Sequence, residues 1–442
     1  MNSATAVTNN KIRGIVHHLN PTAMKQTAII TAVLVMTGIA GARAQLPSLQ
    51  TGGKTMPDAW IDKATGHEII RISRGPASAE SFYFHNNPFL KTADGKGWEM
   101  LYYGHTPEGI QLFTVDLRNY TSTQVTHFGE RFSGEILGKR TRSAYVQATD
   151  SVFSVNLDNG ARKLRYVFPP DFHGHIATVN SNETLLAGVW SDDKEREILK
   201  KYPAKGDFFT RIYDAHIPHV LFTINLRTGV LTKIDSEDNW LNHEQFSPTD
   251  PDLLLYGHEG PWAKVDRTWI INVSTRNKKL LHKRTVAGEI NGHEWWQPDG
   301  RQVWFDLQIP RSVTFYVAGV NVRSGKETRY ALKRDEWSIH YTLSDDMKLF
   351  AGDGGDPTQV ARAKNGMWIY LFHPQGDSLK SEKLVDMQFQ QYRKLEPNVH
   401  FSPDGKWVIF RGNFEGHNEV YAVSVRRVQE SGNERQGTAG RR

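Results

Sequence analysis

The sequence predicts an all-β fold, a seven-bladed β-propeller, because two short motifs alternate along most of the chain. The first motif is a short apolar strand, a turn that resembles Ser-Pro-Asp-Gly, and a second apolar strand that ends in Gly or Asp. It is clearest at residues 397–413, and the other copies lie at residues 84–104, 133–149, 173–190, 242–259, 291–308 and 338–355. A repeat of roughly 40 to 50 residues is typical of propeller blades.

The second motif is an alternating strand, a polar turn and another alternating strand, and it follows each copy of the first. Its copies, of which the last is cut short, begin at or near residues 112, 152, 221, 269, 316, 368 and 421. Alternation with a period of two and turns of Asn-Gly, Thr-Gly or Ser-Gly indicate antiparallel hairpins. The two motifs together supply four strands, and seven such repeats predict a propeller.

The two ends of the repeat region complement each other. The last repeat lacks its outermost strand, whereas residues 66–73 form a strand with no partner at the start. Pairing these strands would close the ring and protect both edges, so we expect the first strand to complete the last blade. Two separate β-sandwiches are the alternative, but sandwiches do not require seven matched turns. Residues 191–214 interrupt the pattern with a charged, partly helical insertion.

The N-terminal segment predicts a signal peptide over residues 1–44. Lys25 precedes an apolar run over residues 27–39, and Ala42-Arg43-Ala44 matches a signal-peptidase site. This run is too short to cross a bilayer, which needs roughly 20 apolar residues. A true start at Met24 would give a well-proportioned signal peptide.

Three segments therefore make up the chain: the signal peptide, a propeller over residues 45–426 and a disordered tail over residues 427–442. We expect a periplasmic or secreted protein with no membrane insertion after signal cleavage. Export would permit disulfides, but the chain has no cysteine, so the core must hold the fold.

The net charge of +6 is concentrated at the two ends of the chain. Residues 1–44 hold four basic and no acidic residues, and residues 426–442 hold five basic and two acidic residues, which leaves −1 for the remainder. The overall charge therefore gives no reason to expect a nucleic-acid partner. Nothing in the sequence indicates an oligomeric state.

Alignment of the repeats by their turns brings four polar residues to one position. His243, His293, His340 and Asn398 each lie six residues before the same turn position. The first strand of each blade lines the channel of a propeller, so we expect these side chains to converge near one mouth. Imidazoles that are neutral near pH 7 suit metal ligation or proton transfer. The alternative is that each histidine only stabilises its turn through hydrogen bonds.

Several common catalytic motifs are absent from the sequence. The segment GHEWW lacks the second histidine of the zinc-protease motif HExxH. There is no GxSxG nucleophile motif and no phosphate-binding loop. Serine hydrolase and nucleotide chemistry therefore have no support.

The histidine-bearing segments resemble those of bacterial oligogalacturonate lyases. The matching segments are NWLNH at 239–243, GHEGPW with VDRTW between 257 and 269, GHEWWQPDG at 292–300 and HYTLSDDMKLFAGDGGDP at 340–357, with a weaker match in FSPDGKWVIF and NFEG near the end. The resemblance covers about the second half of the mature chain. It implies a seven-bladed propeller that cleaves an acidic, pectic oligosaccharide by β-elimination.

The resemblance also implies roles for single residues. His293 matches the Brønsted base that removes the proton alpha to the uronate carboxylate, and Arg267 matches an arginine close to base and substrate. His340 matches a metal ligand, whereas His243 and His258 match positions that line the substrate site. Such a proton becomes acidic only when a metal ion or a guanidinium neutralises the carboxylate. A base that titrates near neutrality must then accept it.

One departure from the family concerns the remaining metal ligands. The family has a Q-x-x-H-x-H pattern before the last turn, and Arg393, Glu396 and Asn398 occupy those positions here. His340, Glu396 and Asn398 could still hold Mn²⁺ or Ca²⁺. Alternatively, Arg393 could replace the ion by pairing with the substrate carboxylate. His400 is two residues out of the histidine register, so we expect it to point away from the channel.

Two other functions compete with a lyase. A non-catalytic, TolB-like periplasmic propeller that binds glycan or protein would carry similar turns, but it would not need the group His243, His293, His340 and Arg267. A propeller glycoside hydrolase generally has paired inward carboxylates, whereas the inward register here carries histidines.

Overall fold

The computed structural model describes residues 46–388 and 395–428. The predicted signal peptide, the residue Arg393 and most of the predicted tail lie outside the described residues. The described chain is built from β-strands, with short helices at two places. The predicted all-β class is therefore confirmed.

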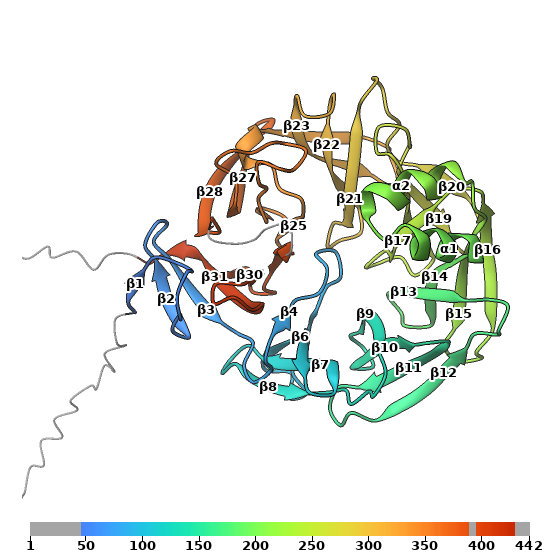
Figure 1. Cartoon of the computed structure of the whole chain (residues 1–442), viewed down its shortest axis with the longest axis horizontal. Coiled ribbons are helices and arrows are strands. Elements are labelled where there is room, and N and C mark those ends of the chain that lie inside the picture. The colour runs from blue at the N-terminus through green and yellow to red at the C-terminus, as the bar shows by residue number, and fades with distance from the viewer. Residues whose placement is uncertain (1–45, 389–394, 429–442) are drawn as a thin grey trace, which may run out of the picture. The chain divides into compact units, whose positions relative to one another are not determined.

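The strands form sheets that surround a common centre (Figure 1). In chain order, the first four sheets contain β4 (Ala79–Glu80), β5 (Phe89–Lys91), β6 (Trp98–Thr106), β7 (Gly109–Asp116) and β8 (Thr121–Gln124); β9 (Phe132–Gly138), β10 (Ser143–Ala148), β11 (Ser151–Asn156) and β12 (Arg162–Val167); β13 (Gly174–Val179), β14 (Leu185–Ser191), β15 (His219–Asn225) and β16 (Leu231–Glu237); and β17 (Leu241–Phe246), β18 (Leu253–His258), β19 (Thr268–Asn272) and β20 (Lys278–Leu280). Neighbouring strands within each sheet are antiparallel.

The next sheet has eight strands because two four-stranded units share one parallel bridge, between Ala331 and Ser378. These units contain β21 (Ile290–Trp296), β22 (Gln302–Gln308), β23 (Phe315–Asn321) and β24 (Glu327–Leu332), and then β25 (Tyr341–Leu343), β26 (Phe350–Gly352), β27 (Trp368–Gln375) and β28 (Ser378–Asp386). The 3₁₀ helix η1 (Arg334–Glu336) lies between the two units.

The last sheet combines both ends of the described chain. Its strands are β1 (Ser48–Leu49), β2 (Ala59–Asp62), β3 (His67–Arg71), β29 (His400–Phe401), β30 (Trp407–Gly412) and β31 (Glu419–Arg427). As expected for the first strand, β3 pairs antiparallel with β31, and Ile69 stands opposite Val423. Strands β1 and β2 extend this sheet further outward, which the sequence analysis did not foresee. The pairing of β3 with β31 thus joins the two ends of the described chain in one sheet, and the exact number of blades stays a prediction.

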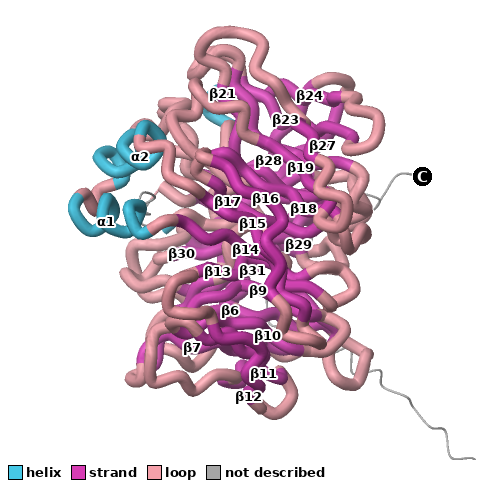
Figure 2. The backbone as a smooth tube through the Cα atoms, turned by 90° about the vertical axis from the view of Figure 1, so that its right-hand side faces the viewer, coloured by secondary structure: helices cyan, strands magenta, loops and turns pink. Residues whose placement is uncertain are grey.

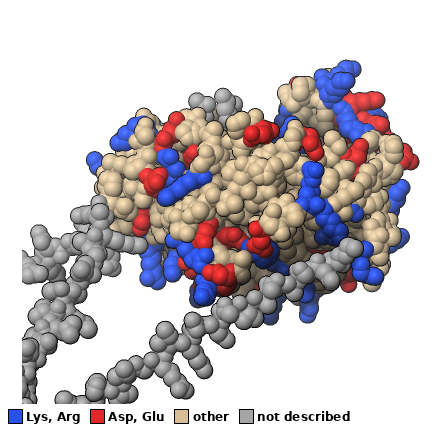
Figure 3. Space-filling model, turned by 90° about the horizontal axis from the view of Figure 1, so that it is seen from below, with Lys and Arg blue, Asp and Glu red and all other residues tan. Residues whose placement is uncertain are grey.

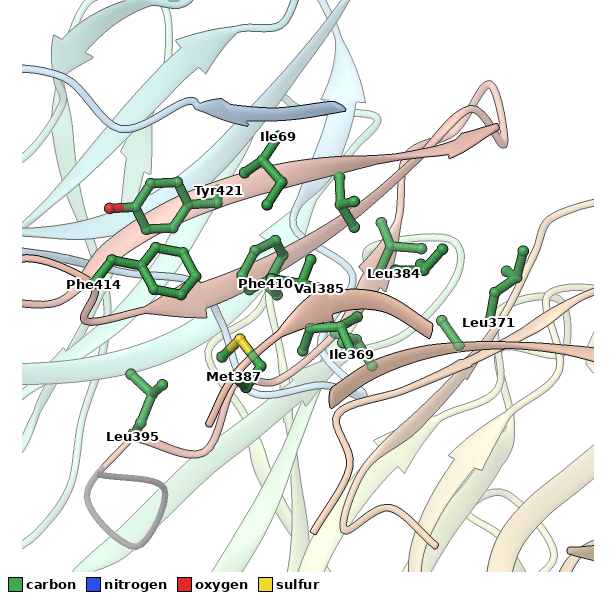
Figure 4. Packing of buried hydrophobic residues seen from close by; sticks show 14 of the residues in the cluster. Ile69, Ile369, Leu371, Leu384, Val385, Met387, Leu395, Phe410, Phe414 and Tyr421 are labelled. Carbon is green, nitrogen blue, oxygen red and sulfur yellow. The ribbon is translucent and has the colours of Figure 1, made fainter. Parts of the chain in front are cut away.

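Apolar residues fill the space between neighbouring sheets. In the cluster of Figure 4, Ile69 on β3 and Phe410 and Tyr421 on β30 and β31 pack with Ile369 on β27 and Leu384 on β28. Ile69, Phe410 and Tyr421 are fully buried. Burial of such a side chain stabilises the fold by about 1.5–3 kcal/mol.

The recurring turn has a simple chemical basis. In the last repeat the hydroxyl of Ser402 donates to Oδ1 of Asp404 at 2.6 Å, and the backbone N–H of Lys406 donates to the same oxygen. Gly405 takes a positive φ of 67°, which suits a residue without a Cβ. Ser344 and Asp346 repeat the first contact at 2.7 Å. The Ser-Pro-Asp-Gly pattern therefore fixes where the first two strands of a blade reverse.

The predicted insertion contains two helices, α1 (Asp193–Lys201) and α2 (Lys205–Asp214), which project from one face of the ring (Figure 2). Asp192 caps α1 by accepting from the N–H of Lys194 at 3.0 Å. None of the helices in the described part of the chain has the length and apolarity to cross a membrane. Seen from below, acidic and basic side chains are interspersed over the surface (Figure 3).

Candidate active site

Two equivalent β-bulges place His243 and His293. The register of β17 against β18 shifts between Asn242 and Gln245, and that of β21 against β22 shifts between Gly292 and Trp295. Within the bulges, His243 has a φ of 61° and His293 a φ of 51°. A bulge re-aims the side chains of the strand that carries it, which is why it recurs near functional sites.

Asn398 and His340 complete the predicted set of four. Asn398 also has a positive φ, of 52°, although it precedes its inner strand β29. His340 lies directly before β25 and is almost fully buried. The turn alignment therefore identifies positions at which three of the four residues share one unusual backbone conformation.

The three histidines meet around the loop that joins β4 to β5, which reaches the centre of the ring in Figure 1. The rings of His293 and His340 are 5.1 Å apart between centroids. Phe84 stacks on His340 at 4.8 Å, and Tyr83 contacts His340 at 5.0 Å and His243 at 6.1 Å. We name His243, His293 and His340 the histidine cluster. No motif in the sequence distinguishes Tyr83 or Phe84 from other aromatic residues of the chain.

His293 is oriented by a buried carboxylate. Its Nδ1 lies 2.8 Å from Oδ1 of Asp306 on β22. Its side chain keeps 26% of its surface exposed, whereas that of Asp306 keeps 3%. Burial acts to lower the pKa of His293, but the hydrogen bond and charge of Asp306 outweigh it, so this pKa is raised. In the neutral ring, a proton on Nδ1 donated to Asp306 leaves the lone pair of Nε2 free to accept another.

Arg267 is buried between two carboxylates. Its Nη1 lies 2.8 Å from Glu259 and its Nε 2.6 Å from Glu294, the residue after His293. Burial acts to raise the pKa of Glu259 and Glu294, but the charge of Arg267 outweighs it and both pKa values are lowered. The guanidinium is therefore engaged with the protein. A bidentate grip of Arg267 on a substrate carboxylate would require one of these two nitrogens, Nε or Nη1, to change its partner.

The two predicted substrate-binding histidines have different surroundings. Nε2 of His243 lies 3.4 Å from Glu259, and its side chain is 21% exposed. Nε2 of His258 instead lies 3.0 Å from the carboxylate of Glu237, and its ring stacks on Trp269 at 5.1 Å. His243 therefore belongs to the histidine cluster, whereas the contacts of His258 are with neighbouring strands further out. The two predicted substrate-binding roles stay predictions.

The predicted metal set was His340, Glu396 and Asn398. Oδ1 of Asn398 accepts the N–H of Phe84 at 3.0 Å, and its Nδ2 donates to the carbonyl of Glu396 at 2.7 Å. Nδ1 of His340 is held by Asp353 at 2.7 Å, and the ring is covered by Phe84. Both polar atoms of the Asn398 amide thus form hydrogen bonds with the backbone. Glu396 is exposed.

A carboxylate on Nδ1, as in the pair of His340 and Asp353, is also the usual support of a metal-bound histidine, so this contact does not exclude an ion. Within residues 46–388 and 395–428, no three His, Asp or Glu side chains are grouped to hold a metal. The predicted metal set therefore stays a prediction; in the structure, His340 is a buried partner of Asp353, and Asn398 anchors the central loop.

His400 lies outside the histidine cluster, but the expectation that it points away from the channel is wrong, because it lines a cavity together with residues of the inner strands β9, β13, β17, β21 and β25. Its Nε2 contacts the carbonyl of Phe82 at 3.0 Å, and burial lowers its pKa to about 4. It lines a cavity of about 690 Å³ together with Phe84, His85 and Trp295 and with residues of the turns. Neither the histidine cluster nor Arg267 lines this cavity. Phe84 lines this cavity and also contacts His293 and His340.

Comparison with known proteins identifies relatives along almost the whole chain. A family model described as oligogalacturonate lyase matches residues 53–429. An oligogalacturonide lyase of Pectobacterium atrosepticum is 26% identical over 386 residues, which cover 83% of this chain and 95% of that protein. An oligogalacturonate lyase of Dickeya dadantii is 25% identical over 385 residues, with the same coverage of each chain.

Two solved structures share the fold. An oligogalacturonate lyase in complex with manganese superposes with a TM-score of 0.70 at 22% identity, covering 86% of this chain and 99% of that one. An oligogalacturonate lyase from Vibrio parahaemolyticus gives a TM-score of 0.71 at 21% identity, with coverages of 85% and 99%. With the family model spanning most of its length, this chain belongs to the oligogalacturonate lyase family.

Proposed function

We propose that the protein is a polysaccharide lyase that cleaves oligogalacturonides by β-elimination, with His293 as the base. Family membership supports the activity and the substrate class. The observation that carries the choice of base is the pair of His293 and Asp306, in which a buried carboxylate orients a solvent-accessible imidazole. A non-catalytic propeller would have no use for this pair.

The proposed reaction begins at the carbon alpha to the uronate carboxylate. Nε2 of His293 takes the proton from this carbon, and the electron pair forms a double bond to the neighbouring carbon. The glycosidic oxygen leaves that neighbouring carbon and takes up a proton. One C–H bond and one C–O bond therefore break, and one C=C double bond and one O–H bond form. Asp306 supports the step because it fixes the ring and stabilises the imidazolium that results.

The supporting residues act on the electrostatics of the site. Arg267 holds Glu259 and Glu294 in place, and Glu259 in turn orients His243 for contact with the substrate. Arg393, which lies outside the described residues, stays a prediction for the cation that neutralises the substrate carboxylate. A relative is described in complex with manganese. Because the amide of Asn398 is committed to Phe84 and Glu396, we assign no step to a metal in this chain.

The test is the ultraviolet absorbance of the unsaturated uronate that elimination creates. Purified protein would be incubated with digalacturonate, trigalacturonate and oligosaccharides of other uronates. His293→Ala should abolish the rise, whereas the matched control His373→Ala, at a residue whose side chain is 46% exposed on β27, should leave it unchanged. Undiminished turnover in His293→Ala, or no rise with any uronate, would refute the proposal.

We also propose that the protein is exported to the periplasm or secreted, on the basis of the apolar run and the cleavage pattern before Gln45. N-terminal sequencing of the protein from the producing cells, together with fractionation, tests this. A mature terminus other than Gln45 and a location in the cytoplasm would contradict it.

A further inference from the structure

Four half-buried aromatic rings gather where α2 meets the ring of sheets. Phe209 on α2 contacts Trp240 at 5.2 Å and Trp262 at 5.7 Å, and Phe208 contacts Trp240 at 6.4 Å. Nζ of Lys205, in the first turn of α2, lies 5.7 Å from the ring of Phe209 and 5.9 Å from that of Trp262. We call Lys205, Phe208, Phe209, Trp240 and Trp262 the aromatic rim.

The aromatic rim is coupled directly to the candidate active site. The carbonyl of Trp240 accepts the backbone N–H of Glu259 at 2.7 Å, and the Glu259 carboxylate contacts His243 and Arg267. Tyr213 of α2 packs against Gly260, where an added Cβ would lie only 2.6 Å from the tyrosine ring. The helix α2 thus packs on the segment that carries Glu259. Glu259 connects the aromatic rim to the histidine cluster, because its N–H binds the carbonyl of Trp240 and its carboxylate contacts His243.

The residues of the aromatic rim are better suited to binding a ligand than to packing in the hydrophobic core. Ile212 is the one fully buried residue of α2, and α1 has none, so the two helices contribute little to the core. The four rings keep part of their surface in solvent. Lys205 is exposed, and its ammonium group lies beside the rings of Phe209 and Trp262. Aromatic faces beside an exposed cation complement the apolar face and the carboxylate of a uronate ring.

We propose that the aromatic rim is a subsite for a further uronate residue of the oligogalacturonide, beyond the residues held at the histidine cluster. Trp262, Trp240 and Phe209 contact the sugar ring, and Lys205 pairs with its carboxylate. This inference rests on the proposed lyase function and deepens it, because it makes the helical insertion the determinant of preference for longer substrates.

The first arm of the test compares kcat/KM for digalacturonate and trigalacturonate. Lys205→Gln should lower the value for the trisaccharide about two- to fivefold and leave that for the disaccharide unchanged, as expected for a partly exposed ion pair. Trp262→Ala should lower the trisaccharide value about two- to tenfold. The matched control Lys200→Gln, at an exposed lysine of α1, should change neither. Equal losses for both substrates, or no loss, would overturn the subsite.

The second arm measures binding without turnover. The affinity of His293→Ala for trigalacturonate and for a neutral trisaccharide would be measured by calorimetry, with and without Lys205→Gln. If Lys205→Gln weakens the binding of trigalacturonate but not that of the neutral trisaccharide, the subsite is supported. If it leaves the binding of trigalacturonate unchanged, the subsite is overturned, whatever the result of the activity assay. A wild-type protein that cleaves no uronate would refute the proposed function, while this arm would still decide the subsite.

Discussion

Asp306 holds His293 from the neighbouring strand, with 2.8 Å between Oδ1 and Nδ1 and a separation of 13 residues in the sequence. Asp353 holds Nδ1 of His340 at 2.7 Å with the same separation. The two pairs occupy equivalent places in successive four-stranded units, and their imidazoles are 5.1 Å apart. Only the first pair combines a buried aspartate with an accessible histidine, because the side chain of His340 is 1% exposed.

Asp306→Asn should slow turnover and move its pH dependence. The base must be neutral, so activity falls as the pH drops through the pKa of His293, which Asp306 raises above the ordinary value of 6.5. Asp306→Asn removes the charge that raises the pKa of His293, so the acid limb of kcat/KM moves to lower pH. We also expect kcat to fall on the order of 100-fold, at the lower end of what a general base contributes. Asp346→Asn, at an exposed turn, is the control. An unshifted acid limb would show that Asp306 does not act on the base.

Arg267→Met should destabilise the fold strongly. The substitution leaves the buried carboxylates of Glu259 and Glu294 without their shared cation. Loss of one partner from a buried ion pair costs about 3–5 kcal/mol, measured as the free energy of unfolding in denaturant. Arg301→Met, at a side chain that is 79% exposed, should cost about 0–1 kcal/mol. Equal, small changes in both variants would mean that Arg267 is not the centre of this network.

Turnover of oligogalacturonides should persist in excess chelator. The amide of Asn398 is bound to backbone groups of Phe84 and Glu396, and Phe84 stacks on His340, so two of the three predicted ligands are engaged within the protein. Elemental analysis of the purified protein should give much less than one equivalent of Mn, Ca or Zn. Loss of activity in chelator, with recovery on addition of Mn²⁺, would contradict this prediction.

Ile69→Ala should lower the free energy of unfolding by about 2–5 kcal/mol, the range for a truncated core isoleucine. Ile69 is fully buried, stands opposite Val423 on the last strand of the ring and packs against β27 and β28. Ile110→Ala, at a residue with 46% exposure, serves as control and should change the free energy little. A loss below about 0.5 kcal/mol in Ile69→Ala, the level of a surface substitution, would argue against a stabilising role for β3.

The turns and the alternating strands predicted the fold because both depend on local chemistry. Ser402, Asp404 and Gly405 form their turn with one another, so the pattern is legible without any partner strand. The common position of His243 and His293 was predictable for the same reason, since a bulge occupies a fixed place in each repeat. The spacing of 13 residues between histidine and aspartate was a further signal in the sequence that the alignment by turns passed over.

The remaining parts of the site depend on contacts between distant segments. Tyr83 and Phe84 come from the first repeat, yet they meet residues more than 150 positions away. The engagement of Asn398 with Phe84 spans 314 positions, and it decides that the amide is not free for an ion. Arg267 carries two carboxylates because its own sheet brings Glu259 to it and the strand β21 of another sheet brings Glu294. No local pattern encodes such pairings.

The loop at the centre of the ring has one more consequence. The N–H of Tyr83 is bound by Glu135 at 2.6 Å and that of Phe84 by Asn398, while their rings rest on His243, His293 and His340. These anchors come from several sides of the ring, so the loop crosses its axis as a plug. The loop lies where a polymer threaded through the described part of the ring would have to pass. Under the proposed function, substrate would therefore enter and products leave by one opening, which suits short, already cut chains.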